Sequence, residues 1–474
     1  MLPKIYPITC HTDHVGTGST FVAIKGFEQD GNKYIEKAIK LGAKKIILED
    51  SAEFSKKTLP KEIEFIFTGN ARKALAIHSA EILGNPASKL KIIGITGTKG
   101  KTSTTFIIEH ILKTAGHKTA LLGTIKNKIL NQEIESKRTT PQSDYFQMFL
   151  HECVKQNVEY VVMEVSAHAL SLDRVYGIEF DAVGFTNLAP EHMDFYKNLE
   201  KYFEAKSLIF NQIKKDGSVI INTEDEWGKK AFKIWFDPSI HFACAKHSGR
   251  ANHISFNKNT FKINQNNLNG LNFSIQKKYE INSPQLFGEF NIYNLTMAFL
   301  ICKQLGLKTE EIISAIKDFD GIPGRLQMHT LKNEAKAFVD YAHNPSSMEA
   351  VLKTLKPLSK KLIVVFGCGG DRDKTKRPVM GKLATKYADK VIITDDNPRF
   401  EEPQNIINEI LTGIDSKDLN KVTCELDRKK AIELAVKSSC KNSVIALLGK
   451  GHENYYSAKG KTFYFDDFEQ ISKF

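Results

Sequence analysis

One segment of the chain constrains the fold more than any other. An apolar run at residues 92–96 leads into a turn that ends at Gly100, and a helical pattern follows over residues 104–115. Glycine lets backbone N–H groups approach an anion closely, and a helix N-terminus adds a positive field, so this layout predicts a phosphate cradle. We expect Lys101 to reach the β- and γ-phosphates of a nucleotide and Thr102 to offer its hydroxyl to Mg²⁺.

The loop is shorter than the common form of this motif. Gly-x-x-x-x-Gly-Lys-Thr requires glycine at position 95, where Ile95 stands, and the glycines of the turn are Gly97 and Gly100. An ordinary strand–turn–helix is the alternative, but strand, glycines, lysine, hydroxyl and helix all fall in order. The motif therefore predicts a nucleoside triphosphate and leaves the reaction open.

Length and charge limit the class of protein. A chain of 474 residues is too long for one core. The net charge of +12 is spread along the sequence, which favours anionic substrates such as nucleotides and carboxylates. No aromatic and basic RNA motif and no zinc-finger spacing occurs, so we expect no nucleic-acid partner.

The cysteines and the N-terminal residues predict a compartment. The seven cysteines form no Cys-x-x-Cys pair, which is typical of free thiols under reducing conditions. The N-terminal residues lack the apolar core of a signal peptide, and no run of 18 apolar residues occurs. We expect a cytoplasmic, monomeric protein without a membrane insertion.

Alternating strand and helix patterns predict an α/β protein of three domains. We expect a small α/β N-terminal domain at residues 1–89 and a central domain at residues 90–324, in which a parallel P-loop ATPase-like sheet carries an accessory β region. A Rossmann-like α/β domain follows at residues 325–474. The polar, alternating stretch at residues 247–285 is typical of a β meander.

Metal-capable side chains follow the predicted strands of the central domain. Glu164 ends the strand at residues 161–165, and the carboxyl edge of such a sheet is where ligands bind. Ser166, His168 and His192 follow at the same expected edge. A zinc hydrolase is a further interpretation, but the close His-x-x-x-His spacing is absent.

The strands of the last domain also end in polar or glycine-rich loops. Four such loops would define one crevice at the sheet edge. They begin after the strands at residues 337–339, 362–366, 390–393 and 443–448.

Taken together, these residues resemble the Mur ligase family, the ATP-dependent amide-bond-forming enzymes of peptidoglycan precursor synthesis. Within the family the resemblance is to the members that add diaminopimelate. The resemblance covers nearly the whole chain. It is carried by residues 96–102, 139–141, 164–168, 185–188, 204–206, 290–294, 324–325, 340–343, 369–373, 396–399 and 449–453.

The resemblance implies sets of site residues. The implied catalytic residues are Lys101, Glu164, His192 and Lys206, and the implied ligands of two Mg²⁺ ions are Thr102, Glu164, His192 and Lys206, the last as a carbamate. The implied ATP contacts are Gly97, Thr98, Lys99, Gly100, Lys101, Thr102, Ser103, Asn291, Asn294, Arg325, Asp340, His343 and Arg377. The implied contacts to a UDP-muramoyl dipeptide are Thr12, Thr139, Thr140, Ser166, Arg174 and Lys206. The implied diaminopimelate contacts are Arg372, Asp396, Asn397, Pro398, Arg399, Gly449 and Glu453.

The chemistry of two of these assignments is understandable from the side chains. An ammonium cannot ligate Mg²⁺, whereas the CO₂ adduct of Lys206 is a carboxylate. Diaminopimelate differs from lysine by a distal carboxylate, which Arg399 can grip bidentately. Lysine would leave that arginine unpaired, so we expect selection against it.

The resemblance also implies a mechanism. ATP phosphorylates the D-glutamate carboxylate of the dipeptide, the amine of diaminopimelate attacks the acyl phosphate, and the last domain closes on the central one. Ligation of L-lysine or another amino acid is an alternative. A non-catalytic nucleotide-binding regulator and a nucleic-acid-joining ATPase are alternatives from other classes.

Overall fold

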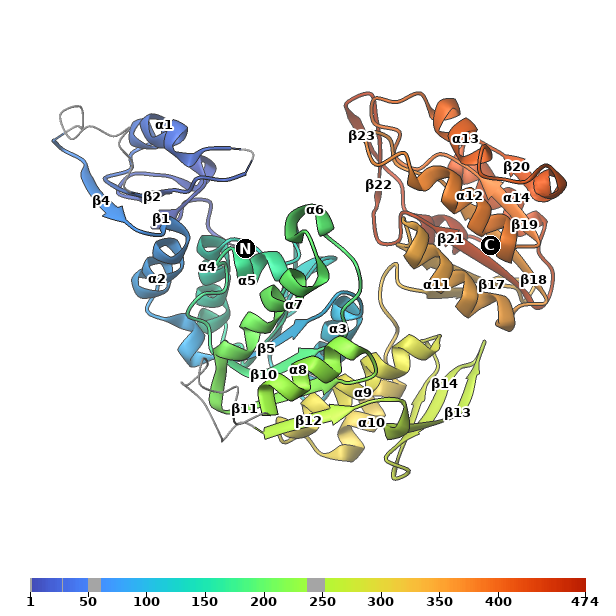
Figure 1. Ribbon diagram of the computed structural model, residues 1–474, viewed down its shortest axis with the longest axis horizontal. Coiled ribbons are helices and arrows are strands. Elements are labelled where there is room, and N and C mark those ends of the chain that lie inside the picture. The colour runs from blue at the N-terminus through green and yellow to red at the C-terminus, as the bar shows by residue number, and fades with distance from the viewer. Residues whose placement is uncertain (1, 28, 50–60, 237–251) are drawn as a thin grey trace. The chain divides into compact units, whose positions relative to one another are not determined.

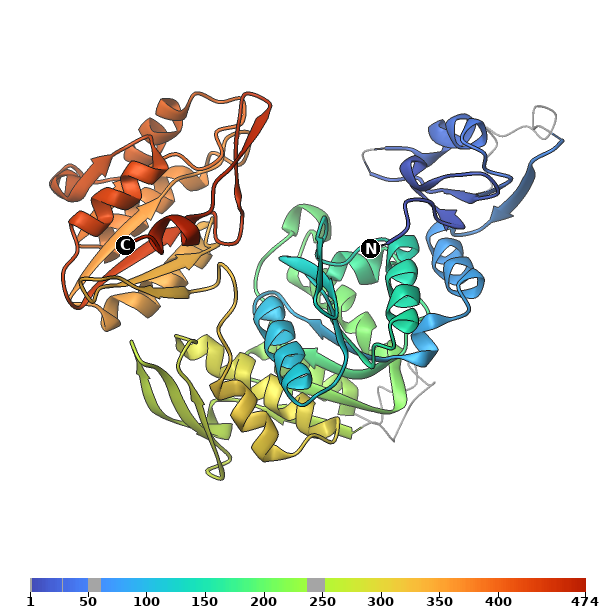
Figure 2. The ribbon, with the colours of Figure 1, turned by 180° about the vertical axis from the view of Figure 1, so that it is seen from behind.

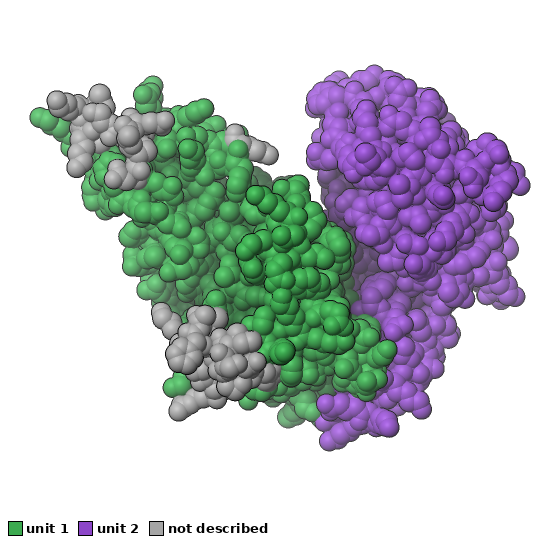
Figure 3. Space-filling view, in the orientation of Figure 1, with its two compact units in different colours: residues 1–260, 293–316 green, residues 261–292, 317–474 purple. Residues whose placement is uncertain are grey.

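A computed structural model describes residues 2–27, 29–49, 61–236 and 252–474. The chain forms two compact units (Figure 3). Unit 1 comprises residues 1–260 and 293–316, and unit 2 comprises residues 261–292 and 317–474. The α/β class is confirmed, and the three domain boundaries stay a prediction.

Unit 1 begins with a four-stranded parallel sheet. Its strands, in spatial order, are β1 (Ile8–Thr9), β2 (Thr20–Ala23), β3 (Lys45–Glu49) and β4 (Glu64–Thr68). Successive strand residues face opposite sides of the sheet. Phe21 and Ile46 therefore pack with α1 (Ile35–Lys40), and Val22 and Ile47 pack with α2 (Ala71–Ile82).

The eight-stranded sheet of unit 1 holds the glycine turn. Its spatial order is β12 (Asn252–Phe256), β11 (Ile213–Asn222), β10 (Phe180–Phe185), β5 (Lys91–Thr96), β9 (Tyr160–Glu164), β6 (Thr119–Leu122), β7 (Lys126–Ile129) and β8 (Gln132–Glu135). The first six strands are parallel, and β7 and β8 are antiparallel. The α-helices of this part are α3 (Lys101–Thr114), α4 (Ser143–Lys155), α5 (Ala167–Ser171), α6 (Met193–Tyr196), α7 (Leu199–Ser207), α8 (Glu226–Phe236), α9 (Glu289–Gln304) and α10 (Thr309–Lys317) (Figure 1). The first four residues of α9 and the last residue of α10 are counted in unit 2.

Two details differ from the sequence prediction. Helix α3 begins at Lys101, three residues earlier than expected, because Gly100 adopts a left-handed conformation and the helix starts directly after it. Residues 252–256 belong to no meander, because β12 pairs parallel with β11 at the edge of the large sheet. The antiparallel meander is limited to β13 (Phe261–Asn267), β14 (Gly270–Ile275) and β15 (Tyr279–Ser283) of unit 2, and residues 247–251 lie outside the described residues.

Unit 2 contains a six-stranded sheet. Its order is β16 (Gln327–Thr330), β17 (Lys336–Asp340), β21 (Ser443–Leu448), β18 (Lys361–Phe366), β19 (Lys390–Ile393) and β20 (Val422–Cys424). All neighbours are parallel except β16 and β17. A hairpin of β22 (Tyr455–Ala458) and β23 (Lys461–Tyr464) follows (Figure 2).

Alternate side chains of these strands point to opposite faces of the sheet, and both sets are buried. Helices must therefore cover both faces. Leu362, Val364 and Phe366 of β18 share one core, and Ile363 and Val365 share another. The first core includes α11 (Pro345–Leu355), α12 (Lys376–Tyr387) and α13 (Pro403–Leu411), and the second includes α14 (Arg428–Lys437) and α15 (Asp467–Ile471). Because helices cover both faces of the sheet, a ligand is expected at the loops that follow the carboxyl ends of the strands.

Candidate active site

The glycine turn of unit 1 has the backbone geometry of an anion cradle. Gly97 has φ of +141° and Gly100 has φ of +87°. A Cβ atom on Gly100 would lie 2.4 Å from the side-chain oxygen of Asn294, so only glycine fits there. Lys101 donates hydrogen bonds from Nζ to the carbonyls of Gly97 and Thr98, at 2.8 and 2.9 Å. The predicted ATP residues 97–103 and Asn294 thus lie together in unit 1.

The residues directly after β10, the neighbouring strand in the sheet, hold this turn by hydrogen bonds. The hydroxyl of Thr186 donates to the carbonyl of Lys99 at 2.7 Å, and the backbone N–H of Lys99 donates to the Asn187 side chain at 2.9 Å. The Lys99 ammonium forms an ion pair with Glu191 at 2.9 Å. Burial opposes ionisation of Glu191, but the charge of Lys99 outweighs it and lowers the pKa of the carboxyl.

The Glu164 carboxylate lies beside Thr102. Glu164 is 1% exposed at the end of β9, and its Oε2 accepts a hydrogen bond of 3.0 Å from the Thr102 hydroxyl. Thr124 donates to the same carboxylate through its backbone N–H at 2.7 Å and through its hydroxyl at 3.1 Å. A hydroxyl and a carboxylate are oxygen ligands of the kind that Mg²⁺ prefers, so this pair fits a magnesium site.

Lys206 is a buried lysine at the same edge of the sheet. It is 1% exposed, and its Nζ donates to the Gly97 carbonyl at 2.7 Å. Burial and the charge of Lys101 lower its pKa well below the usual range. A buried lysine with a depressed pKa has more of the neutral amine that reacts with CO₂, so the side chain fits a carbamate.

Two histidines lie near this edge. The ring of His192 lies 4.8 Å from the ring of His168, between centroids. Burial lowers the pKa of both imidazoles, which favours the neutral form that ligates metals. Among the described residues no three histidine, cysteine or acidic side chains form a metal cluster. The two-ion ligand set therefore stays a prediction.

The predicted dipeptide contacts gather beside Glu164. The Thr140 hydroxyl donates to the Glu164 carbonyl at 2.9 Å and accepts from the Ser166 backbone N–H at 3.0 Å. Arg174 donates to the Thr140 carbonyl at 3.1 Å. Thr139 is connected through a 3.0 Å hydroxyl contact with Thr124. With Lys206, five of the six predicted contacts thus lie at one edge of the sheet.

Two further arginines, neither of them predicted from the sequence, lie near Arg174. Burial, with the charges of Arg138 and Arg72, lowers the pKa of Arg174 to about 10. Three guanidinium groups that repel one another are suited to an anionic ligand. Arg138 directly precedes Thr139 and could have been noticed, whereas Arg72 lies on α2 and carries no local signal.

Thr12, the remaining predicted contact, lies in the N-terminal sheet region. It is buried in a short 3-10 helix of residues Thr12–His14. The preceding residues form hydrogen bonds with Asp144 of α4. The Thr9 hydroxyl and the Cys10 backbone N–H both donate to its carboxylate, at 2.8 and 3.0 Å. These contacts fix the segment before Thr12, and the role of Thr12 itself stays a prediction.

The other predicted ATP residues belong to unit 2. Asp340 ends β17, and its carboxylate accepts from the backbone N–H groups of Leu326 and Ala342, at 2.7 and 2.9 Å. The Arg325 guanidinium lies 5.1 Å from the centre of the Tyr341 ring, and His343 contacts the Tyr341 carbonyl at 2.8 Å. Arg325, Asp340 and His343 thus surround Tyr341. The Asn291 side chain donates to the Phe287 carbonyl at 2.9 Å.

Arg377 has a different environment from the other predicted ATP residues. Its side chain is fully buried, and it forms ion pairs with Glu401 at 2.9 Å and Glu409 at 2.7 Å. It also donates to the Gly369 carbonyl at 3.1 Å. Its guanidinium thus holds together two loops of unit 2, and the predicted phosphate contact stays untested.

The predicted diaminopimelate residues come from three neighbouring loops of unit 2. Asp396, Asn397, Pro398 and Arg399 follow β19, Gly449 and Glu453 follow β21, and Arg372 follows β18. Asn397 Nδ2 donates to Glu453 Oε2 at 3.0 Å, and the Tyr341 hydroxyl donates to Glu453 Oε1 at 3.2 Å. Burial and the charge of Asp396 raise the pKa of Glu453.

Arg399 is held by its backbone and by its side chain. It has φ of +56°, and its backbone N–H donates to the Ser457 carbonyl at 3.0 Å. One guanidinium nitrogen donates to the Gly370 carbonyl at 2.6 Å. Arg372 is exposed, and Gly449 has φ of +111° with Asp396 only 2.7 Å from where a Cβ would stand. Oriented guanidinium and amide donors with a nearby carboxylate suit a zwitterion.

Comparisons with known proteins agree with this geometry. Three family descriptions match: "Mur ligase family, catalytic domain" over residues 4–88, "Mur ligase middle domain" over residues 95–302, and "Mur ligase, glutamate ligase domain" over residues 324–451. A UDP-N-acetylmuramoyl-L-alanyl-D-glutamate–2,6-diaminopimelate ligase of Clostridium botulinum is 41% identical, with 99% of this chain and 95% of that protein covered. The chain belongs to the Mur ligase family. It is an ATP-dependent ligase.

The chain is also similar to Mur ligases from other sources. The protein of the same name from Aquifex aeolicus is 38% identical, with 100% of this chain and 94% of the relative covered. A solved structure of a ligase with that name aligns with a TM-score of 0.70 at 28% identity, over 99% of this chain and 94% of the other. Within the described parts of this Mur ligase, no helix has both the length and the apolar character to cross a membrane.

Proposed function

We propose that this Mur ligase joins meso-2,6-diaminopimelate to the D-glutamate carboxylate of UDP-N-acetylmuramoyl-L-alanyl-D-glutamate, with hydrolysis of ATP to ADP and phosphate. The observation that carries the proposal is the loop set of Asn397, Arg399 and Glu453 in unit 2. Those side chains offer donors to a carboxylate and an acceptor to an ammonium, which are the groups at the distal centre of diaminopimelate. The names of the relatives support the same acceptor.

The reaction divides into two balanced steps. An oxygen of the D-glutamate carboxylate attacks the γ-phosphorus of ATP, the bond to the β-phosphate oxygen breaks, and ADP leaves. The amine of diaminopimelate then attacks the acyl carbon, the acyl–oxygen bond of the acyl phosphate breaks, and inorganic phosphate leaves as the amine loses its proton. The product is an amide.

Residues of the cradle stabilise the phosphoryl transfer. Lys101 neutralises charge on the phosphates, and the N-terminal turn of α3 offers backbone N–H donors. Thr102 and Glu164 would hold one Mg²⁺ ion, and His192 with a carbamate on Lys206 would hold a second. The ions would screen charge on the transferred phosphoryl group. Arg174 and Thr140 would hold the dipeptide carboxylate toward the nucleotide.

The biological setting follows from these substrates. The reaction belongs to peptidoglycan precursor synthesis and so to cell-wall growth, cell shape and division. Its substrates are small and water-soluble, so we infer a cytoplasmic enzyme that needs neither a nucleic acid nor a membrane partner. We also propose that the enzyme is a monomer.

The deciding experiment is the amino-acid dependence of ADP formation. Purified enzyme, the UDP-linked dipeptide, ATP and Mg²⁺ are combined with diaminopimelate, L-lysine or no acceptor. We expect turnover with diaminopimelate and at least 30-fold lower kcat/KM with lysine, because lysine leaves Arg399 unpaired. Equal rates with both amino acids contradict the proposed acceptor, and ATP binding without ADP formation indicates a regulator instead.

A further inference from the structure

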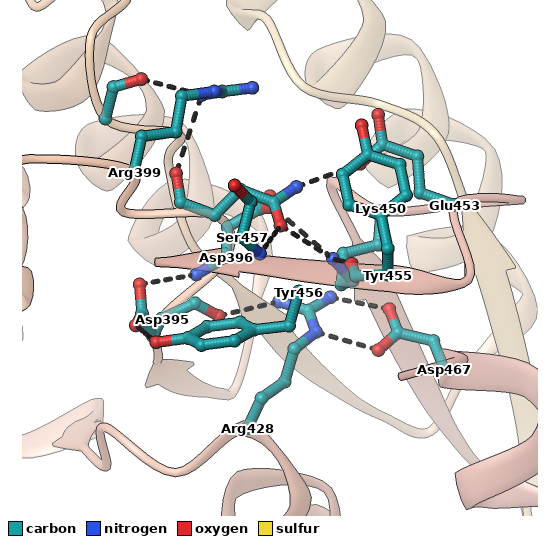
Figure 4. A network of polar contacts seen from close by, with 12 residues as sticks. Asp395, Asp396, Arg399, Arg428, Lys450, Glu453, Tyr455, Tyr456, Ser457 and Asp467 are labelled. Atoms are coloured by element: carbon teal, nitrogen blue, oxygen red, sulfur yellow. Dashed lines mark hydrogen bonds and ion pairs between the residues drawn. The ribbon is translucent and has the colours of Figure 1, made fainter. Parts of the chain in front are cut away.

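Lys450 is a buried cation for which the proposed reaction has no use. It follows β21 in the turn at residues 449–453, and its side chain is 0% exposed. Its Nζ donates to the Asn397 side-chain oxygen at 3.3 Å and to the Tyr455 carbonyl, and it lies 3.9 Å from the Asp396 carboxylate (Figure 4). A buried ammonium is costly, and a methionine of similar length would fill the space without that cost.

The contacts of Lys450 determine which way the Asn397 amide points. Asn397 Oδ1 receives hydrogen bonds from Lys450 Nζ and from the Ser457 backbone N–H, the latter at 2.9 Å. An ammonium and a backbone N–H donate and cannot accept, so the amide oxygen must occupy this position. The amide nitrogen is thereby turned to the opposite side, where it donates to Glu453 Oε2 at 3.0 Å.

This orientation matters for a bound amino acid. An amide nitrogen has two N–H groups, and Glu453 takes one of them. The second N–H can then serve as a donor to an amino acid bound at the loop set of Asn397, Arg399 and Glu453, which the proposed function assigns to diaminopimelate. A flipped amide would present an oxygen there, and an oxygen would repel the substrate carboxylate and the Glu453 carboxylate alike.

A second buried group fixes the strand ends on which these residues sit. The Arg428 guanidinium forms a bidentate ion pair with Asp467, with distances of 2.7 and 2.6 Å. It also donates to the Asp395 carbonyl at 3.2 Å (Figure 4). A further hydrogen bond of 3.1 Å goes to the Leu448 carbonyl. These carbonyls lie at the carboxyl ends of β19 and β21, two residues before Asn397 and Lys450 respectively. The backbones that carry the two side chains are thus held at a fixed separation.

We propose that Lys450 is a positioning residue that acts through Asn397: it fixes the Asn397 amide with its nitrogen toward the amino-acid substrate and so sets affinity for diaminopimelate. The inference rests on the proposed function. Burial lowers the pKa of Lys450, with the Asp396 carboxylate acting in the opposite direction. Charge on Lys450 strengthens its hydrogen bond to the amide oxygen, since bonds to charged donors are the stronger ones.

The test is a double-mutant cycle in the full-length enzyme. Lys450→Met removes the donor, Asn397→Ala removes the amide, and Lys461→Met, an exposed lysine of β23, is the matched control. We expect Lys450→Met to raise the KM for diaminopimelate about 10- to 100-fold, with the KM for ATP changed less than threefold. In the Asn397→Ala background the same substitution should change that KM less than threefold, and Lys461→Met should change nothing.

Additive effects would overturn the proposal, because a lysine that only supports the fold would harm enzymes with and without the amide equally. An equal rise in both KM values would overturn it too. If wild-type enzyme uses another amino acid and not diaminopimelate, the proposed acceptor is wrong, and the cycle is measured with that amino acid.

A second measurement does not depend on turnover or on the acceptor. The side-chain NH₂ resonance of Asn397 is observed in enzyme with ¹⁵N-labelled asparagine and assigned by its loss in Asn397→Asp. We expect this resonance to move in Lys450→Met and to stay in place in Lys461→Met. An unmoved resonance in folded Lys450→Met enzyme would overturn the inference.

Discussion

Lys206 and Lys101 donate to the same backbone oxygen, the carbonyl of Gly97, at 2.7 and 2.8 Å. Two ammonium groups that share one acceptor repel each other, and Lys206 is also buried. Conversion of Lys206 to a carbamate would replace this repulsion with an attraction between opposite charges. This repulsion is a physical reason for the carbamate that we propose on Lys206.

We expect Lys206→Ala to lower kcat at least 100-fold, because the second set of metal ligands and the pairing with Lys101 are lost together. Added acetate or formate should restore part of the activity by supplying a carboxylate in the vacated space. ADP formation measured against acid concentration checks this. Lys201→Ala removes an exposed lysine from the same helix and should leave the rate unchanged. Loss of activity without any rescue would contradict a carboxylate role.

The Thr102 hydroxyl is expected to act through Mg²⁺. Thr102→Val keeps the shape and removes the oxygen that bonds to Glu164. We expect the Mg²⁺ concentration for half-maximal activity to rise about 10- to 100-fold, since an oxygen ligand is lost. Thr102→Ser keeps the hydroxyl and should stay within about threefold of wild type. An unchanged Mg²⁺ dependence in Thr102→Val would show that the hydroxyl is not a ligand.

Arg399 should discriminate between acceptors. Arg399→Ala is expected to lower kcat/KM for diaminopimelate about 30- to 1000-fold and to change the value for lysine much less, because only diaminopimelate has the distal carboxylate. The measurement is the ratio of the two kcat/KM values. A ratio that stays at the wild-type value would mean that selection lies elsewhere.

The Arg377–Glu401 ion pair predicts a pH dependence of stability. A hydrogen bond from Arg377 lowers the pKa of the Glu401 carboxyl to about 2, from a usual value of 4.5. A depressed folded-state pKa stabilises the protein above the unfolded-state value, and this contribution is lost as the pH falls from about 4.5 toward 2.

Glu401→Gln is therefore expected to lower the melting temperature at pH 7, through a loss of about 1–3 kcal/mol of stability. The difference from wild type should shrink below pH 4.5, because wild-type Glu401 then begins to take up a proton. Melting curves at pH 7, 5 and 3.5 provide the check. Glu402→Gln changes the neighbouring, exposed carboxyl and is the control. A difference that grows on acidification has the wrong sign for this mechanism.

Local features of the sequence were sufficient for the elements and the class. Apolar runs predicted β5 and β18, and the glycines with Lys101 and Thr102 predicted the turn between β5 and α3. These signals are readable because strand burial, glycine conformation and helix initiation depend on residues close in sequence. The resemblance to Mur ligases also predicted which loops at the sheet edges carry the site residues.

The tertiary structure alone decided the strand orders and the partners of the polar side chains. The parallel pairing of β12 came from its place at a sheet edge, and its polar, alternating sequence had suggested a meander. The Asn397 amide is oriented by Lys450 and Ser457, more than fifty residues away, and Arg428 meets Asp467 from another helix. Hydrogen bonds between distant segments depend on how the chain folds back on itself, and this cannot be predicted from local residue patterns.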